Sequence, residues 1–146
     1  MKIRVAKTAG FCFGVRNALE ITERELAKHP GEPLCTYGPL IHNRDVIQRL
    51  EEKGVRVISC PEEVRAGERV IIRAHGIGRQ VYEALKQQGA VLIDATCPFV
   101  KKIHRIVEEH SAAGESILIL GNPEHPEVQG IMGWSHSPCM IMEGPE

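Results

Sequence analysis

The chain has 146 residues, of which 42% are hydrophobic and 25% are charged, and its formal net charge is −1 at pH 7. This balance is ordinary for a globular protein and provides no basic surface for nucleic acid. No apolar run approaches the roughly 20 residues that a membrane-spanning helix needs. The start of the sequence lacks the apolar core of a signal peptide, so we expect a cytoplasmic protein that binds neither membranes nor nucleic acid.

Strands and helices are predicted to alternate along the sequence. An apolar strand is expected at residues 2–6, and apolar residues at helical spacing predict a helix over 15–27. Asn43 is placed to cap a second helix, which Gly54 ends. The remaining strands are expected at 34–37, 55–58, 69–73, 91–94, 116–120 and 139–142, and helical segments at 61–63, 79–88 and 99–112, with a short helical turn before the last strand.

This order indicates an α/β fold. Strands that alternate with helices of about ten residues are typical of βα units and a parallel sheet. The predicted strands are continuously apolar and rich in valine and isoleucine, as expected when helices cover both faces of a sheet. Since ligands of open α/β sheets bind beyond the carboxyl ends of the strands, the residues that follow each strand are the functional candidates.

Nearly every predicted strand is followed by a cysteine or a histidine with glycine or proline beside it. These residues are Cys12, His42, His75, Cys97 and His125, with Glu127 two positions further on. Their convergence on one sheet edge predicts a site. Asp94 and Thr96 are expected to fix the loop that presents Cys97.

The segment around Cys12 has a composition of its own, with one cysteine between two phenylalanines and a glycine on either side. A thiolate at the start of a helix is favoured by the helix dipole. Phe11 and Phe13 would keep water from the sulfur, which suits a soft metal centre whose potential depends on burial. The alternative is a buried structural cysteine in a strand-to-helix turn.

The other cysteines and histidines are interpreted as structural. In a reducing compartment we expect thiols rather than disulfides. Cys35 and Cys139 fall inside predicted strands as core thiols, and Cys60 is a cap or a spectator. His29, His104, His110 and His136 are expected to be surface or helix residues.

Two chemistries fit the candidate set. The two thiolates and three imidazoles can together hold a transition metal. Alternatively, the thiolates bind iron and the imidazoles bind an anion, which the neighbouring helix N-termini favour. Glu127 can deliver protons or can be a solvated first-turn carboxylate that complements the helix dipole. Asn43 can add a donor to the anion or act only as an N-cap.

Five motifs together resemble the 4-hydroxy-3-methylbut-2-enyl diphosphate reductase family, the last enzymes of the methylerythritol phosphate route to isoprenoids. The motifs are Gly10-Phe11-Cys12-Phe13-Gly14-Val15, Ile41-His42-Asn43, Ala74-His75-Gly76, Asp94-Ala95-Thr96-Cys97-Pro98 and His125-Pro126-Glu127-Val128. The resemblance covers nearly the whole chain, with the motifs in the family's order.

The resemblance implies a trefoil-like reductase of three α/β units around a central 4Fe-4S cluster. Cys12 and Cys97 match two of its three cysteine ligands, and His42, His75 and His125 match the histidines that hold the substrate diphosphate. Glu127 matches the proton donor. The implied reaction removes the substrate hydroxyl reductively and gives isopentenyl and dimethylallyl diphosphate, with electrons from a ferredoxin- or flavodoxin-type carrier.

The sequence departs from the family in length, because the third unit and its cysteine are absent. We therefore expect an N-terminal cluster strand and loop at residues 1–13, a full α/β unit at 14–97 and a partial second unit at 98–146. We expect that such an incomplete member, which lacks the C-terminal portion of the family fold, does not turn over substrate alone. Two other hypotheses are a zinc-binding module and a metal-free α/β module that binds a phosphorylated metabolite.

Overall fold

The computed structural model describes residues 2–144, so residues 1, 145 and 146, at the ends of the first and last predicted segments, lie outside the described residues. The elements in chain order are α1 (Phe13–Lys28), β1 (Leu34–Tyr37), α2 (Arg44–Glu52), β2 (Val55–Ile58), the short 3-10 turn η1 (Pro61–Glu63), β3 (Arg69–Ile72), α3 (Arg79–Gln87), β4 (Val91–Asp94), α4 (Pro98–Ala112), β5 (Leu118–Leu120), α5 (Pro126–Met132) and β6 (Met140–Met142). The predicted order of strands and helices is confirmed from residue 13 onward.

Four strands form one parallel sheet in the order β2-β1-β3-β4. Leu34 pairs with Val55 on one side and with Arg69 on the other, and Arg69 pairs with Val91. All four strands therefore end at the same edge, which is the arrangement that the alternation of strands and helices predicts. The α/β fold class is confirmed.

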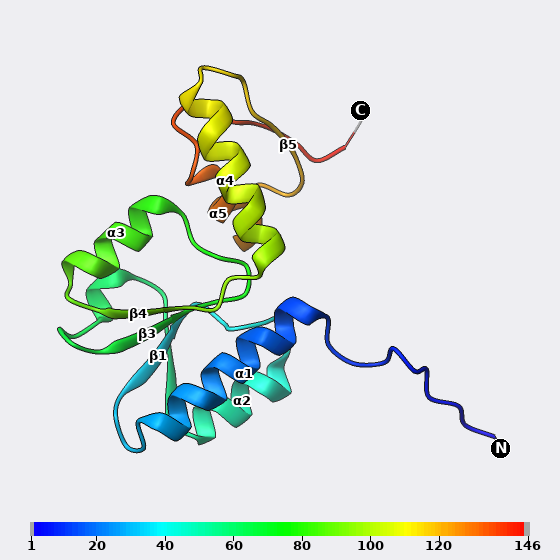
Figure 1. Cartoon of the computed structure of the whole chain (residues 1–146), viewed down its shortest axis with the longest axis vertical. Coiled ribbons are helices and arrows are strands. Elements are labelled where there is room, and N and C mark those ends of the chain that lie inside the picture. The colour runs from blue at the N-terminus through cyan, green and yellow to red at the C-terminus, as the bar shows by residue number, and fades with distance from the viewer. Residues whose placement is uncertain (1, 145–146) are drawn as a thin grey trace.

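Helices cover both faces of this sheet, with α1 and α2 on one face and α3 on the other (Figure 1). Along β3, Ile71 packs with Leu34 and Ala18 on the α1 and α2 side. Val70 and Ile72 point to the opposite face and pack with Leu85 of α3. Side chains alternate between the faces of a strand, so an uninterrupted apolar strand is buried on both sides.

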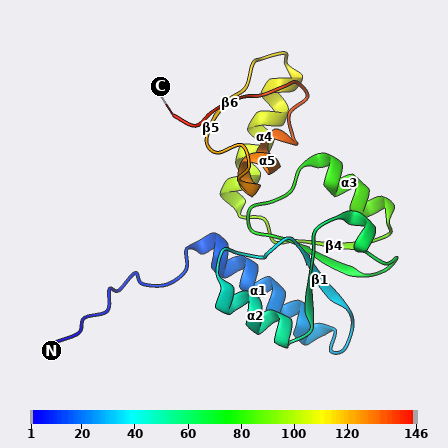
Figure 2. The same ribbon diagram turned by 180° about the vertical axis from the view of Figure 1, so that it is seen from behind.

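A second, smaller sheet pairs β5 with β6 in parallel, with Leu118 opposite Met140. The intervening α5 makes this a βαβ unit, and α4 packs against α5 (Figure 2). Large apolar side chains of this sheet remain exposed, namely Leu118, Leu120, Met140 and Met142. Among residues 2–144 no helix is both long enough and apolar enough to cross a bilayer.

The predicted strand at residues 2–6 is wrong. Residues 2–12 contain no strand and leave the body of the molecule as an extended segment (Figure 1). Ile3 and Val5 are 76% and 81% exposed. A strand needs a neighbour for its backbone N–H and C=O groups, and no described strand lies beside this segment.

Candidate functional site

Three histidines from distant parts of the chain lie together. The ring centroids of His42 and His75 are 4.4 Å apart, and that of His125 is 5.6 Å from His42 and 5.8 Å from His75. His42 follows β1, His75 follows β3, and His125 is the N-cap residue of α5. We call these three residues the histidine cluster.

Backbone hydrogen bonds connect the loops of the site. The Ala74 amide donates to the Leu40 carbonyl at 3.2 Å, and the Cys97 amide donates to the Ala74 carbonyl at 3.0 Å. These hydrogen bonds therefore connect the loop that carries His42 to the loop that carries His75, and that loop to the loop that carries Cys97. Asn43 caps α2, since its Oδ1 accepts from the Val46 amide at 3.0 Å.

His75 is the most buried member of the histidine cluster. Its pKa is lowered to about 4, mainly by burial and in addition by repulsion from the neighbouring His42, Arg73 and His125 side chains. At neutral pH the His75 ring is therefore uncharged in the ligand-free protein. An anion placed against this ring would favour its protonated form.

His125 has a defined hydrogen-bonding state. Its Nδ1 accepts from the Glu127 amide at 3.2 Å and so caps α5. Because a neutral imidazole has one donor and one acceptor nitrogen, the Nε2 of His125 carries the proton and can donate to a ligand. The half-buried Glu127 lies in the first turn of α5, and within residues 2–144 its carboxylate has no ion-pair partner.

Both candidate cysteines are N-cap residues, Cys12 of α1 and Cys97 of α4. The two helix N-termini meet at Gly14, where an added Cβ would lie 2.6 Å from the Cys97 Sγ. Glycine is required at this contact because any side chain would displace the thiol. The structure therefore brings Cys97 against the first turn of the helix that Cys12 caps.

The expected phenylalanine shield is wrong for this part of the chain. Phe11, Phe13 and Phe99 are 42%, 56% and 70% exposed, and Cys12 is exposed as well. The shield requires the rings to pack on the sulfur, but the segment that carries Phe11 leaves the body of the molecule.

The loop before Cys97 is held as expected. Asp94 Oδ1 accepts from the Thr96 amide at 2.9 Å, and its other oxygen pairs with Lys101 at 2.7 Å. Burial raises the pKa of Asp94, but the hydrogen bonds from Lys101 and Thr96 outweigh it, so the net pKa is lowered. The carboxylate therefore stays ionised at neutral pH and fixes the turn into α4.

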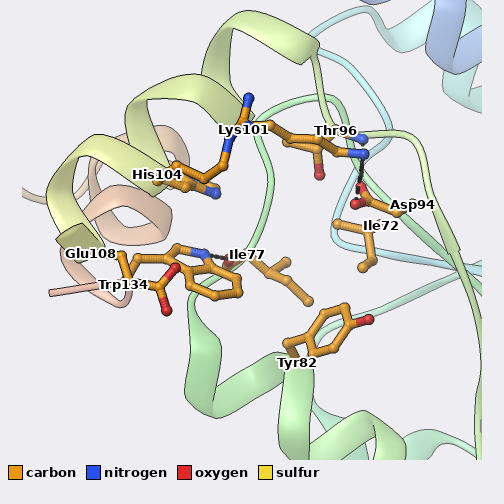
Figure 3. Close-up of a pocket in the computed structure, with 10 residues that line it drawn as sticks. Ile72, Ile77, Tyr82, Asp94, Thr96, Lys101, His104, Glu108 and Trp134 are labelled. Atoms are coloured by element: carbon orange, nitrogen blue, oxygen red, sulfur yellow. Dashed lines mark hydrogen bonds and ion pairs between the residues drawn. The ribbon is translucent and has the colours of Figure 1, made fainter. Parts of the chain in front are cut away.

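Sequence reasoning missed a support beneath the histidine cluster. His104 of α4 is only 6% exposed and is stacked on Trp134, with centroids 5.7 Å apart (Figure 3). The ring lies so close to Gly76 that an added Cβ there would be 2.6 Å from the His104 Cε1. The expectation that His104 is a surface or helix residue is confirmed, since it lies in α4, and its burial is an additional finding of the structure.

Trp134 extends this support to the other side of the His75 loop. Its Nε1 donates to the Ile77 carbonyl at 2.8 Å (Figure 3). His104 and Trp134 line a cavity of about 490 Å³ with Tyr82 and Ile72. The available signal in the sequence was the single tryptophan, which is seldom placed without a hydrogen-bond partner.

The remaining cysteines take structural positions. Cys35 is fully buried, and burial raises the pKa of its thiol to about 12. Cys60 begins η1 in a capping arrangement with Glu63, as expected for a cap. Cys139 lies just before β6 and is half-buried, so its expected core position is wrong, because the two-stranded sheet leaves one side open.

The two cysteines and the histidine cluster are separate arrangements. Within residues 2–144 no group of three or more histidine, cysteine, aspartate or glutamate side chains is placed to hold a metal ion. Thiolates are the ligands of iron–sulfur clusters, so the free thiols of Cys12 and Cys97 have the chemistry of such ligands.

Fold and site together define an α/β protein in which two cysteine-capped helices and an imidazole cluster lie beyond the ends of parallel strands. The chain belongs to the LytB protein family, whose profile matches residues 3–146. It is 49% identical to the 4-hydroxy-3-methylbut-2-enyl diphosphate reductase of Caldanaerobacter subterraneus subsp. tengcongensis, over 100% of this chain and 51% of the relative. The corresponding reductase of Clostridioides difficile is 39% identical over 98% of this chain and 51% of its own length.

Solved structures show the same likeness. The structure of (E)-4-hydroxy-3-methyl-but-2-enyl diphosphate reductase, the terminal enzyme of the non-mevalonate pathway, has a TM-score of 0.82 and 39% identity, over 97% of this chain and 51% of that one. The Plasmodium falciparum reductase has a TM-score of 0.88 and 34% identity, over 94% of this chain and 43% of that one. The chain thus spans about half the length of the curated relatives it matches.

Proposed function

We propose that this chain provides the substrate diphosphate site of a 4-hydroxy-3-methylbut-2-enyl diphosphate reductase and two cysteine ligands of its iron–sulfur cluster. The observation that carries the proposal is the histidine cluster, with centroids 4.4 to 5.8 Å apart beside the cysteine-capped helices. In this proposal residues 14–97 form the first α/β unit, residues 98–146 belong to the second, and residues 1–13 lead into the site.

The histidines suit a diphosphate for two reasons. The proton on Nε2 of His125 is available to a phosphate oxygen, because Nδ1 is used by the Glu127 amide. His75 is neutral when the site is free and gains a proton when an anion lies against it. The histidine cluster therefore offers neutral hydrogen-bond donors before substrate binds, which keeps the cost of desolvation modest. After substrate binds, it also offers a positive charge.

Cys12 and Cys97 are proposed as ligands of a 4Fe-4S cluster. When bound, such a cluster supplies electrons one at a time for reductive loss of the substrate hydroxyl, with a ferredoxin- or flavodoxin-type protein as the proposed source. Gly14 allows the Cys97 thiol to reach the α1 N-terminus. Glu127 is proposed to deliver the proton, because it lies two residues from His125 at the start of α5.

Binding experiments test the diphosphate site first. Calorimetric titration of inorganic diphosphate should show affinity that falls at least tenfold in His42→Asn and His125→Asn. The matched control is His29→Asn, which changes a histidine at the far end of α1 and should bind like the unaltered chain. Equal affinity in all these variants would exclude the histidine cluster as the anion site.

Anaerobic reconstitution with iron and sulfide tests the cysteines. We expect bound iron and a broad visible absorption band, both lost in Cys12→Ser and Cys97→Ser and retained in Cys60→Ser. Because this chain provides two cysteine ligands, we expect no turnover of substrate with a chemical reductant. Normal turnover by these 146 residues would contradict the expectation that two cysteine ligands are too few for activity. Unaltered binding and spectra in both cysteine variants would favour a metal-free module for a phosphorylated metabolite, and bound zinc without a visible band would favour the zinc module.

A further inference from the structure

A second cavity lies at the carboxyl edge of the four-stranded sheet, and its lining residues differ from those of the histidine cluster. It has a volume of about 430 Å³, and none of the three histidines lines it. Its polar lining comes from the end of β1, the residue after β2, the residue after β3, and helices α3 and α5. These residues are Tyr37, Ser59, Arg73, Gln80 and Gln129.

The position of this cavity in the sheet is the one where ligands of open α/β folds bind. Strands β1 and β3 are neighbours in the order β2-β1-β3-β4. From β1 the chain continues through α2 on one face, and from β3 it continues through α3 on the other (Figure 1). The connections from β1 and β3 thus run to opposite faces of the sheet and toward opposite edges of it. In open α/β sheets a crevice forms beyond the strand ends at such a switch point.

Arg73 gives the cavity its charge. Its guanidinium is half-buried and has no carboxylate within 4.0 Å among the described residues. Its hydrogen bond from Nε to the Gly76 carbonyl is long at 3.4 Å. Burial lowers the pKa of Arg73, yet an arginine remains charged in proteins, so this half-buried charge has no carboxylate partner within residues 2–144.

The backbone is shaped to keep the guanidinium in this position. Gly38, directly after β1, has φ +67, and a Cβ added there would collide with Nη1 of Arg73. The positive φ favours glycine at this position, and the missing side chain leaves room for the Arg73 guanidinium. The arrangement places an unpaired guanidinium across the crevice rather than in open solvent.

Neutral donors surround the guanidinium. Burial raises the pKa of Tyr37, so its hydroxyl stays protonated and can donate. Gly78 caps α3 without a side chain, and in the first turn of this nine-residue helix the Arg79 amide donates to the Gly133 carbonyl, which leaves the next two amides without an acceptor among residues 2–144. Two residues of that turn, Gln80 and Val81, line the cavity. The nearby Glu63 carboxylate is occupied by the amides of Ser59 and Cys60.

We propose that this cavity binds the phosphate group of a small metabolite through Arg73, at a site separate from the histidine cluster. A phosphate has several acceptor oxygens and fits the fork of a guanidinium, and the neutral donors supply the remaining hydrogen bonds. The Arg73 charge also lowers the pKa of His75, so neutralising that charge would make His75 easier to protonate.

The test uses the 146-residue chain with His42→Asn, His75→Asn and His125→Asn, so that the histidine cluster no longer contributes. Inorganic phosphate is titrated and followed by amide signals in two-dimensional NMR. We expect shifts at Gly78, Gln80 and Val81, and at least tenfold weaker binding in Arg73→Gln. Arg49→Gln, which changes an exposed arginine of α2, is the matched control and should bind like its parent.

A second variant keeps the test informative if Arg73→Gln does not fold. Gln80→Glu adds a negative charge at an exposed residue of the cavity and should abolish phosphate binding while the spectrum stays folded. The proposal is overturned if phosphate does not bind at millimolar concentrations, if neither variant weakens it, or if acetate binds as tightly as phosphate. Because the histidine cluster is disabled throughout, failure here leaves the proposed reductase function untouched.

Discussion

The imidazole of His104 is stacked on the indole of Trp134 at an interplanar angle of 22°, directly behind the loop that carries His75. His104 belongs to α4, and Trp134 follows α5. The pair joins the two sheet-containing parts of the chain, since Trp134 also donates to the Ile77 carbonyl. The stack therefore supports the histidine cluster without lying in it.

Trp134→Ala should destabilise the protein by about 2–4 kcal/mol, because it removes a large packed ring and one hydrogen bond. Trp134→Phe keeps the stack but leaves the Ile77 carbonyl unpaired, so its cost should be about 1 kcal/mol. Urea unfolding measures both changes. Lys102→Ala, at an exposed position of α4, is the control, and an equal effect of all three substitutions would contradict the role of the stack.

Acid should destabilise the fold through His104. Burial lowers its pKa from 6.5 to about 4. Below pH 6.5 the histidine is therefore protonated in the unfolded chain, whereas in the folded protein it stays neutral until the pH falls to about 4. The stabilisation is complete above pH 6.5 and is lost as the pH falls toward 4. His104→Gln should remove about 2–3 kcal/mol of this pH dependence. Unfolding curves at pH 4.5 and 7.5 measure it, and an unchanged difference would refute it.

Much of the fold could be predicted from the sequence because local patterns agree with the tertiary structure. The strands at 34–37, 55–58 and 91–94 have the predicted bounds, since glycine before or near each strand and apolar runs within it mark the ends. The strand at 2–6 was wrong because apolar composition alone does not provide a neighbouring strand.

In the candidate site, too, local sequence patterns predicted some residues, whereas the positions of others depend on tertiary packing. Glycine- and proline-flanked residues after strands led to His42, His75 and His125, because parallel strands deliver their ends to one edge. The burial of His104 could not be foreseen, since it depends on how closely α4 approaches Gly76 and Trp134. Contacts of this kind arise from packing between elements rather than from periodicity within one.

Gly14→Ala should disturb Cys97 rather than its own helix. Alanine favours a helix over glycine by about 1 kcal/mol, but its Cβ would lie 2.6 Å from the Cys97 Sγ. We expect an altered alkylation rate at Cys97 and several-fold less iron after reconstitution. Mass spectrometry of alkylated peptides measures the first effect. Arg16→Ala, an exposed change on the same helix, should alter neither, and an unchanged Cys97 rate in Gly14→Ala would exclude the contact.

Diphosphate binding should be accompanied by proton uptake at His75. The pKa of His75 is about 4 in the free protein, and a bound anion raises it. Affinity should therefore increase as the pH falls from 8 to 6. Titration in buffers of different ionisation enthalpy counts the protons, and His75→Gln should reduce the count while His29→Gln leaves it unchanged. Binding without any uptake would mean that the anion does not reach His75.

The histidine cluster is assembled from two bodies, since His42 and His75 follow strands of the larger sheet whereas His125 begins α5 beside the smaller one. The separations of 5.6 and 5.8 Å to His125 therefore measure how closely the start of α5 approaches the loops of the larger sheet. A ligand that engages all three rings would therefore bridge the two sheets of the chain, which also approach one another where Gly78 meets Gly133.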